Sequence, residues 1–349
     1  MHFARPHLSP LGMRDAGLDV LRRRVGRQLD AEVFQRDPDY ICEHLPTFQR
    51  VLTTYFAPEV RGVEKLPDEG PFLLVSNHSG GLLMPDAWAL GTRLLARFGT
   101  ERPVYGLTFD FAFAIPGFGT ALRKSGAIPA SPEHAEQALS LDAGVIVYPG
   151  GDWEVYRPWT ERNRIEFHDH VGFVRLALRR QVPVFPVVSH GSHESLIVVS
   201  RGDRLARLLG LDRLRINVFP IMLGIPFGIG PVFVPNVPLP AKVVVEVLEP
   251  LDWGHLSRDA ADDPDVVRAC YEEITTRMQQ ALDRLVRELP HPLWRRLLGA
   301  VGLAGPAGAR TDSAPVGGDR HGQHQEITDC DQGPAGSCSM DVALAAGEA

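Results

Sequence analysis

A histidine followed by two glycines and an aspartate is the feature of this chain best suited to chemistry. His78 follows the apolar run 72–76, and Gly80, Gly81 and Asp86 come after it. A neutral imidazole can take a proton from a hydroxyl when a carboxylate binds its other nitrogen, because the carboxylate fixes the tautomer and stabilises the imidazolium that forms. His78 and Asp86 are therefore predicted to be a general base and its partner, a pair that suits acyl transfer to an alcohol.

Asp86 also has a structural interpretation. Residues 87–98 have a helical pattern, and an aspartate just before a helix is a preferred N-cap. A histidine and an aspartate in sequence remain a hypothesis until their structural context is known.

A second apolar run, 145–148, also ends in a glycine turn. The turn and its sequel contain Pro149, Gly150, Gly151, Asp152 and Arg157. Backbone N–H groups in such a turn can bind a polar or anionic head group and an arginine can clamp it, the alternative being a plain turn with a structural arginine. In a parallel sheet the two turns would share the carboxyl edge, where α/β folds bind ligands.

The elements that must position these turns follow from the hydrophobic pattern. Short apolar runs alternate with helical ones from residue 71 onward, which is typical of α/β layers. The predicted helices include one after an N-cap at Ser131, one that begins near Gly172 and one over 264–289. The predicted strands are 72–76, 104–107, 126–129, 145–148, 184–188 and 243–248. The predicted fold class is α/β, a single domain with a mixed, mostly parallel sheet flanked by helices.

Composition divides the chain into three regions. These are an N-terminal helical region over 1–59, the domain with both glycine turns over 60–300, and a tail over 305–349 that is predicted to be disordered. The tail holds seven of the 43 acidic and two of the 36 basic residues, so the rest has 36 acids and 34 bases. A body this balanced does not predict nucleic-acid binding.

Four blocks of the sequence resemble, in order and spacing, those of the glycerolipid acyltransferase superfamily, which includes the 1-acylglycerol-3-phosphate acyltransferases. The blocks are Asn77–His78 with Asp86, Gly126–Pro129, Tyr148–Gly151 and Val182–Val187. The third block, with its Pro-Gly-Gly, and the later stretch 172–178 look closer to the branch that contains diacylglycerol acyltransferases.

The resemblance implies direct transfer of a fatty acyl group, without an acyl-enzyme, from acyl-CoA or acyl carrier protein to the hydroxyl of a glycerolipid. The reaction would serve phospholipid or neutral-lipid synthesis, with no cofactor beyond acyl-CoA as co-substrate. His78 would be the base and Asp86 its partner. The residues predicted to bind substrate, from the resemblance and from the loops near the site, are Asn77, Gly80, Gly81, Gly126, Ile128, Pro129, Pro149, Gly150, Gly151, Asp152, Arg157 and Glu194.

The chain departs from the family pattern in two places. The family commonly has four residues between histidine and aspartate, whereas seven separate His78 from Asp86, so the turn must bulge outward, which Gly80 and Gly81 permit. The third block commonly carries a glutamate where this chain has Gly150, and its arginine comes sooner than Arg157 does. The departure in the third block weakens the case for a phosphorylated acceptor and leaves a neutral hydroxyl lipid open.

Other readings stay open at this point. The acceptor can be diacylglycerol or a long-chain alcohol, the protein can be a hydrolase of lipid esters or thioesters, or it can bind lipid without catalysis. The spacing of His190, His193 and Glu194 matches no helical zinc motif, so no metal is predicted. The chain has no Gly-x-Ser-x-Gly pattern, which argues against an α/β-hydrolase.

Membrane contact is predicted for 201–235. Arginines and leucines alternate over 201–215, and the apolar run 216–235 is interrupted by prolines and glycines that would break a spanning helix. The run is predicted either to dip into a lipid interface or to line an acyl-chain tunnel. The four cysteines form neither a metal nor a disulfide pattern. The predicted location is cytoplasmic, peripheral on the inner face of the membrane.

Overall fold

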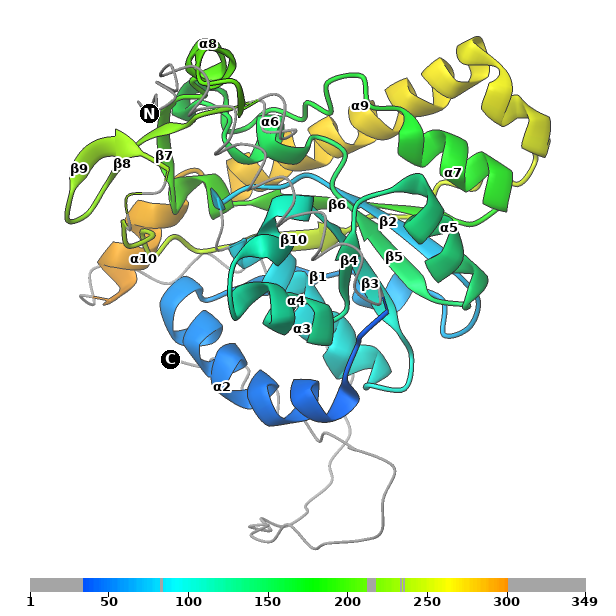
Figure 1. The fold of residues 1–349 in the computed structure, drawn as a ribbon, viewed down its shortest axis with the longest axis horizontal. Helices are drawn as coiled ribbons and strands as arrows, with labels where there is room; N and C mark the ends of the chain where they lie inside the picture. Colours follow the sequence, from blue (N-terminus) through cyan, green and yellow to red (C-terminus); the bar gives the residue numbers. More distant parts are fainter. Residues whose placement is uncertain (1–33, 82–83, 212–217, 233, 235, 301–349) are drawn as a thin grey trace, which may run out of the picture.

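The computed structural model describes residues 34–81, 84–211, 218–232, 234 and 236–300 (Figure 1). Its helices are α2 (Pro38–Phe56), α3 (Pro85–Phe98), α4 (Phe118–Lys124), α5 (Pro132–Ser140), α6 (Gly151–Val155), α7 (Gly172–Arg180), α8 (Asp203–Leu208), α9 (Pro264–Glu288) and α10 (Pro292–Ala300). Its strands are β1 (Glu59–Arg61), β2 (Phe72–Ser76), β3 (Val104–Thr108), β4 (Ala127–Pro129), β5 (Gly144–Val147), β6 (Val184–His190), β7 (Ile197–Ser200), β8 (Ile221–Gly224), β9 (Gly228–Pro231) and β10 (Val244–Val247).

Within these residues the main sheet has seven strands in the order β1-β10-β6-β2-β5-β3-β4. The five strands from β6 to β4 are parallel to their neighbours, and β10 runs antiparallel to β6 with β1 parallel beside it. The predicted mixed, mostly parallel sheet is therefore confirmed. The strand β2 lies at its centre, between β5 and β6.

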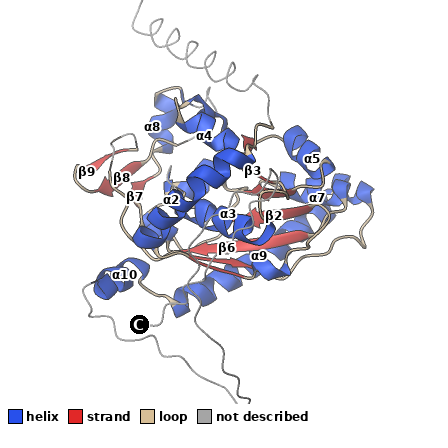
Figure 2. Ribbon diagram, turned by 90° about the horizontal axis from the view of Figure 1, so that it is seen from below, coloured by secondary structure: helices blue, strands red, loops and turns tan. Residues whose placement is uncertain are grey.

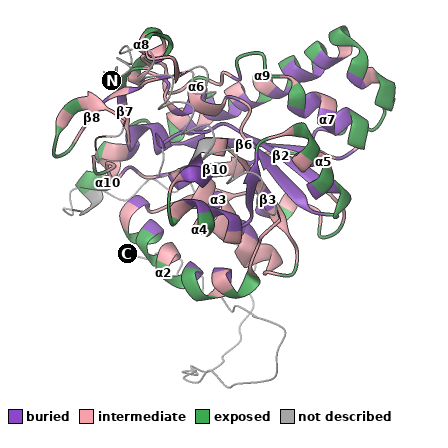
Figure 3. Cartoon of the chain, viewed as in Figure 1, coloured by how far each residue is buried: buried purple, intermediate pink, exposed green. Residues whose placement is uncertain are grey.

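Helices cover both faces of this sheet (Figure 2). Successive side chains of a strand point to opposite faces, so Leu73 and Val75 pack with α5, α7 and α9, whereas Phe72 and Leu74 pack with α2 and α3. All of β2 is buried, as Figure 3 shows for the middle of the sheet. A strand that is buried on both faces needs a continuous apolar run, and this is why 72–76 has one.

The six predicted strands appear as β2, β3, β4, β5, β6 and β10, each within two residues of its predicted bounds. The predicted N-cap Ser131 accepts a hydrogen bond from the backbone N–H of His134 at 3.2 Å. The strand β1 was not predicted, because two of its three residues are charged.

Part of the predicted N-terminal region and the whole tail over 305–349 lie outside the described residues, and α2 is the described part of that region. The apolar run 216–235 forms the hairpin of β8 and β9 where it is described. No helix in the described ranges is both long enough and apolar enough to cross a bilayer.

Candidate active site

The carboxyl end of β2 leads into the glycine turn that carries His78. Gly80 and Gly81 have φ angles of +87° and +64°, a conformation that favours glycine. A Cβ atom on Gly80 would lie 2.5 Å from Cδ of Pro85, and one on Gly81 would lie 2.6 Å from Cδ2 of Leu196. The two glycines thus have the conformational freedom that the long first block requires.

Asp86 lies in the first turn of α3, and the N-cap of that helix is Met84. The alternative prediction, in which Asp86 is itself the N-cap, is therefore wrong. Its Oδ2 accepts from Nδ1 of His78 at 3.1 Å and from the backbone N–H of Ser79 at 3.0 Å. The positive end of the α3 dipole also favours a carboxylate there. Since a carboxylate only accepts, the proton of the neutral imidazole lies on Nδ1, and Nε2 is the nitrogen that can act as a base.

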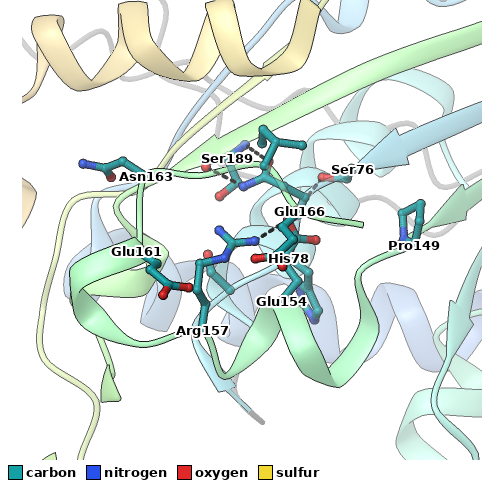
Figure 4. Close-up of polar contacts among 12 residues, drawn as sticks. Ser76, His78, Pro149, Glu154, Arg157, Glu161, Asn163, Glu166 and Ser189 are labelled. Atoms are coloured by element: carbon teal, nitrogen blue, oxygen red, sulfur yellow. Dashed lines mark hydrogen bonds and ion pairs between the residues drawn. The ribbon is translucent and has the colours of Figure 1, made fainter. Parts of the chain in front are cut away.

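Glu154, which was not among the predicted site residues, binds the main chain of His78. Its Oε2 accepts from the backbone N–H of His78 at 3.2 Å, and its Oε1 accepts from Nη2 of Arg157 at 2.9 Å (Figure 4). Burial raises the pKa of Glu154 to about 7, while the charge of Arg157 limits the rise. A Cβ atom on Gly150 would lie 2.5 Å from Oε2 of Glu154. The carboxylate of Glu154 thus lies against Gly150, the position at which the family that the sequence resembles commonly carries a glutamate.

Arg157 is enclosed by protein. Its side chain has no exposed surface, and its Nε and Nη1 atoms have no hydrogen-bond partner among the described residues. The predicted head-group clamp needs a guanidinium that a ligand can reach, whereas the guanidinium of Arg157 holds Glu154 in this structure. The spacing of three residues between Glu154 and Arg157, which is that of neighbours on a helix, was the available signal in the sequence.

Asn77 and Tyr148 fix the surroundings of His78. The side-chain amide of Asn77 donates to the carbonyl of Ser189 at 2.9 Å and accepts from its N–H at 2.6 Å, which joins the ends of β2 and β6. The ring of Tyr148 lies 4.3 Å from that of His78, centroid to centroid. Burial and the charge of Asp86 raise the pKa of Tyr148 well above its usual range. Asn77, predicted to bind substrate, uses its amide to align the strands.

The loop after β6 is hydrogen-bonded to the connection between α9 and α10. His190 donates from Nε2 to the carbonyl of Leu289 at 2.8 Å, and Oε2 of Glu194 accepts from the N–H of Leu293 at 2.8 Å. Oε1 of Glu194 lies 3.6 Å from Nε of Arg162. The carboxylate of Glu194, a predicted substrate contact, is therefore buried and engaged by protein groups.

His193 follows in the same loop and was not predicted as a site residue. Burial lowers its pKa well below the usual range, and the nearby charges of Arg157 and His78 act in the same direction. Its Nε2 is buried without a hydrogen-bond partner in the described part of the chain. The described residues contain no group of three or more His, Cys, Asp or Glu side chains arranged to hold a metal.

The remaining predicted residues divide into two groups. Pro149, Gly150, Gly151 and Asp152 form the turn and the start of α6, the helix that supplies Glu154. Gly126, Ile128 and Pro129 belong to the edge strand β4 and its entry, and two strands, β5 and β3, lie between β4 and β2. Gly126 precedes β4 and so lies at the amino end of the parallel strands, whereas His78 lies at their carboxyl end. Ile128 is fully buried in the core. None of the described contacts connects this second block to His78.

The comparisons with known proteins concern the family of this chain. The sequence profile of the Acyltransferase family matches residues 57–190, a range that contains His78, Asp86 and Glu154. An uncharacterized protein of Mycobacterium tuberculosis is 31% identical over 267 residues, which is 76% of this chain and 72% of that protein. The bovine protein named DGAT1/2-independent enzyme synthesizing storage lipids (Bos taurus) is 27% identical over 190 residues, 54% of this chain and 55% of that protein.

Among solved structures, the 1-acyl-sn-glycerophosphate (LPA) acyltransferase PlsC from Thermotoga maritima is similar, with a TM-score of 0.45 and 18% identity over 78% of this chain and 88% of that chain. The family profile covers the histidine, its aspartate and the second glycine turn, and the mycobacterial relative matches over most of both chains. The chain belongs to the acyltransferase family, and its sequence blocks resemble those of the glycerolipid acyltransferase superfamily.

Proposed function

We propose that this protein transfers a fatty acyl group from acyl-CoA or acyl carrier protein to the hydroxyl of a glycerolipid. The observation that carries the proposal is the 3.1 Å hydrogen bond between Nδ1 of His78 and Oδ2 of Asp86, in a buried turn at the carboxyl end of β2. This arrangement leaves Nε2 of His78 as the base, and family membership makes acyl transfer its reaction.

The steps of the reaction follow one another while the substrates are bound to the enzyme. Nε2 of His78 takes the proton of the acceptor hydroxyl while the oxygen forms a bond to the thioester carbonyl carbon. The tetrahedral intermediate collapses, the bond from carbon to sulfur breaks, and the imidazolium returns its proton to the departing thiolate. Asp86 stabilises the imidazolium between these steps.

The oxyanion of the intermediate needs N–H donors that are not already used. The backbone N–H of His78 donates to Glu154 and that of Ser79 donates to Asp86. We therefore propose that the oxyanion is stabilised by the backbone N–H groups of Gly80 and Gly81, which follow in the same turn.

The burial of Arg157 indicates which kind of acceptor fits the site. Because its guanidinium is paired with Glu154 and has no exposed surface, it does not offer a site to a phosphate, and a neutral lipid hydroxyl fits better. Diacylglycerol and a long-chain alcohol are the neutral candidates. The name of the bovine relative, which refers to storage lipids, supports this choice. We propose that the protein meets its acceptor as a peripheral protein on the cytoplasmic side of a membrane.

The test is mass-spectrometric detection of products from purified protein given palmitoyl-CoA with lysophosphatidate, diacylglycerol or a fatty alcohol. The wild type is compared with His78→Ala and with His44→Ala, which removes an exposed histidine of α2. We expect a new ester from the wild type and from His44→Ala, and a loss of at least about 100-fold for His78→Ala. If His78→Ala turned over as fast as the wild type, His78 would not be the base.

The same assay separates the rival functions. Free fatty acid released without an acceptor, and no ester with one, would identify a hydrolase. Lipid binding by a folded protein that gives no product with any acceptor would identify a binding protein without catalysis.

A further inference from the structure

The small sheet formed by β7, β8 and β9 is apolar on both faces. Val198 pairs with Met222, and these inward-facing side chains are 1% and 4% exposed. On the other face, Ile197, Leu223 and Ile229 form a row across the three strands. Leu223 and Ile229 are 42% and 69% exposed. An antiparallel sheet with one face in water usually carries polar side chains there, so this apolar row needs a partner.

The tip of the hairpin continues the apolar surface. Ile225 and Phe227 are 64% and 60% exposed, and residues 216–241 contain no charged side chain. The sheet projects from one end of the molecule (Figure 1). We call the row Ile197, Leu223 and Ile229, together with the tip residues Ile225 and Phe227, the outer face. A contiguous exposed apolar surface of this kind marks an interaction site.

Basic elements flank the outer face. The helix α8 exposes Arg204 and Arg207, of which Arg207 is paired with Asp203 at 3.3 Å, and α10 carries Arg295 and Arg296 beside the exposed Trp294. The sequence of α10 has no acidic residue, and Figures 1 and 2 place α10 at the same end of the molecule as the β7–β9 sheet. Basic side chains beside an apolar surface complement an anionic lipid bilayer. A second copy of the chain docked on this face would instead bring arginines toward arginines.

The β7–β9 sheet is also connected to the active site along the chain. Leu196, which directly precedes β7, lies against Gly81 of the catalytic turn, and Ser195 accepts at its carbonyl from the N–H of Leu239 at 2.8 Å. We propose that the outer face docks the protein on an anionic lipid bilayer, so that the acceptor reaches His78 from the membrane. This inference rests on the proposed function, since it supplies the lipid acceptor of that reaction.

The test is sedimentation of the full chain with vesicles of phosphatidylcholine alone or with phosphatidylglycerol. In the double variant Ile225→Ser with Phe227→Ser, we expect the partition coefficient on mixed vesicles to fall at least about tenfold. The matched control, Val51→Ser with Leu141→Ser, changes side chains that are 59% and 54% exposed elsewhere and should bind like the wild type.

The charge is tested with Arg204→Gln combined with Arg207→Gln. This variant should lose about tenfold on mixed vesicles and keep its binding to phosphatidylcholine alone. Turnover with a short-chain acyl-CoA and a detergent-dispersed acceptor should stay unchanged in both double variants, which shows that they fold.

Two results would overturn the docking surface. One is unchanged vesicle binding by the tip variant, and the other is a lipid-free dimer that the tip variant converts to a monomer. Binding is measured without turnover, so His78→Ala should bind vesicles normally. If the wild type gave no ester but bound vesicles through the tip, the proposed function would fail and the docking surface would stand.

Discussion

Two buried carboxylates hold His78 from different sides. Asp86 orients the imidazole through Nδ1, whereas Glu154 holds the backbone N–H of the same residue. Asp86 also accepts from two further backbone N–H groups, so its position does not depend on His78 alone. At the scale of single residues, the site is thus a histidine whose ring and main chain are anchored separately.

The Asp86→Asn variant tests the orientation of the ring. An amide can donate to Nδ1 and so favour the tautomer with its proton on Nε2, which removes the base. We expect kcat to fall at least about 100-fold. Urea denaturation should show that the variant stays folded, and a folded variant that retained half of the wild-type kcat would contradict the role of Asp86.

Glu154→Gln tests the second anchor. The substitution leaves the guanidinium of Arg157 buried without its counter-charge, so the free energy of unfolding at pH 8 should fall by about 3–5 kcal/mol. Adding Arg157→Met should recover part of the loss. The control Glu161→Gln removes one of the two carboxylate partners of Arg201, at a partly exposed site where about 1 kcal/mol or less is expected. A Glu154→Gln protein as stable as the control would rule out the buried pair as an anchor.

At the scale of elements, one glycine turn sets the relation between β2 and α3. Gly80 has a φ of +87°, and a Cβ atom there would meet the ring of Pro85, the first residue of α3. Asp86 is the next residue of that helix. The packing of this turn therefore decides whether the carboxylate reaches His78.

Gly80→Ala should separate the catalytic pair. A left-handed backbone costs a non-glycine residue about 1–3 kcal/mol, and relief of the contact with Pro85 moves Asp86 away from His78. Both the free energy of unfolding and kcat should decrease. The control Gly91→Ala lies within α3 with no atom near its added Cβ, and it should stabilise by about 1 kcal/mol without loss of activity. Equal effects of the two substitutions in denaturation and turnover assays would refute this account.

At the scale of the whole molecule, buried histidines make stability depend on pH. Burial lowers the pKa of His190 and of His193 below the usual range. The folded chain therefore binds fewer protons than the unfolded chain as the pH falls below about 6.5, and the free energy of unfolding decreases. Glu154 acts in the opposite sense as the pH falls through about 7, because its raised pKa lets the folded chain take up a proton first.

The variant His193→Gln isolates the contribution of His193 to the pH dependence of the free energy of unfolding. The free energy of unfolding of the wild type minus that of the variant should decrease as the pH falls below 6.5, by up to about 1.4 kcal/mol per pH unit. Urea denaturation between about pH 7.5 and pH 5.5 measures this difference. The variant His44→Gln replaces an exposed histidine and is the control. A difference that does not depend on pH would mean that His193 is not held neutral in the folded protein.

The features that depend on neighbours along the chain could be predicted from the amino-acid sequence. Apolar runs predicted the six main strands, the cap at Ser131 predicted α5, and the pattern around His78 and Asp86 predicted the pair that the structure brings together. These features follow from backbone preferences and side-chain periodicity, which act over a few residues.

Which distant segments share a surface became known from the folded structure and not from the sequence. The strand β2 lies between β5 and β6, which come much later in the chain, and this order brings Glu154 to His78 and leaves β4 at the edge. The same packing encloses Arg157 and leaves Ile225 and Phe227 exposed. Burial and ion pairing depend on contacts between segments far apart in sequence, and no local pattern specifies which of these contacts form.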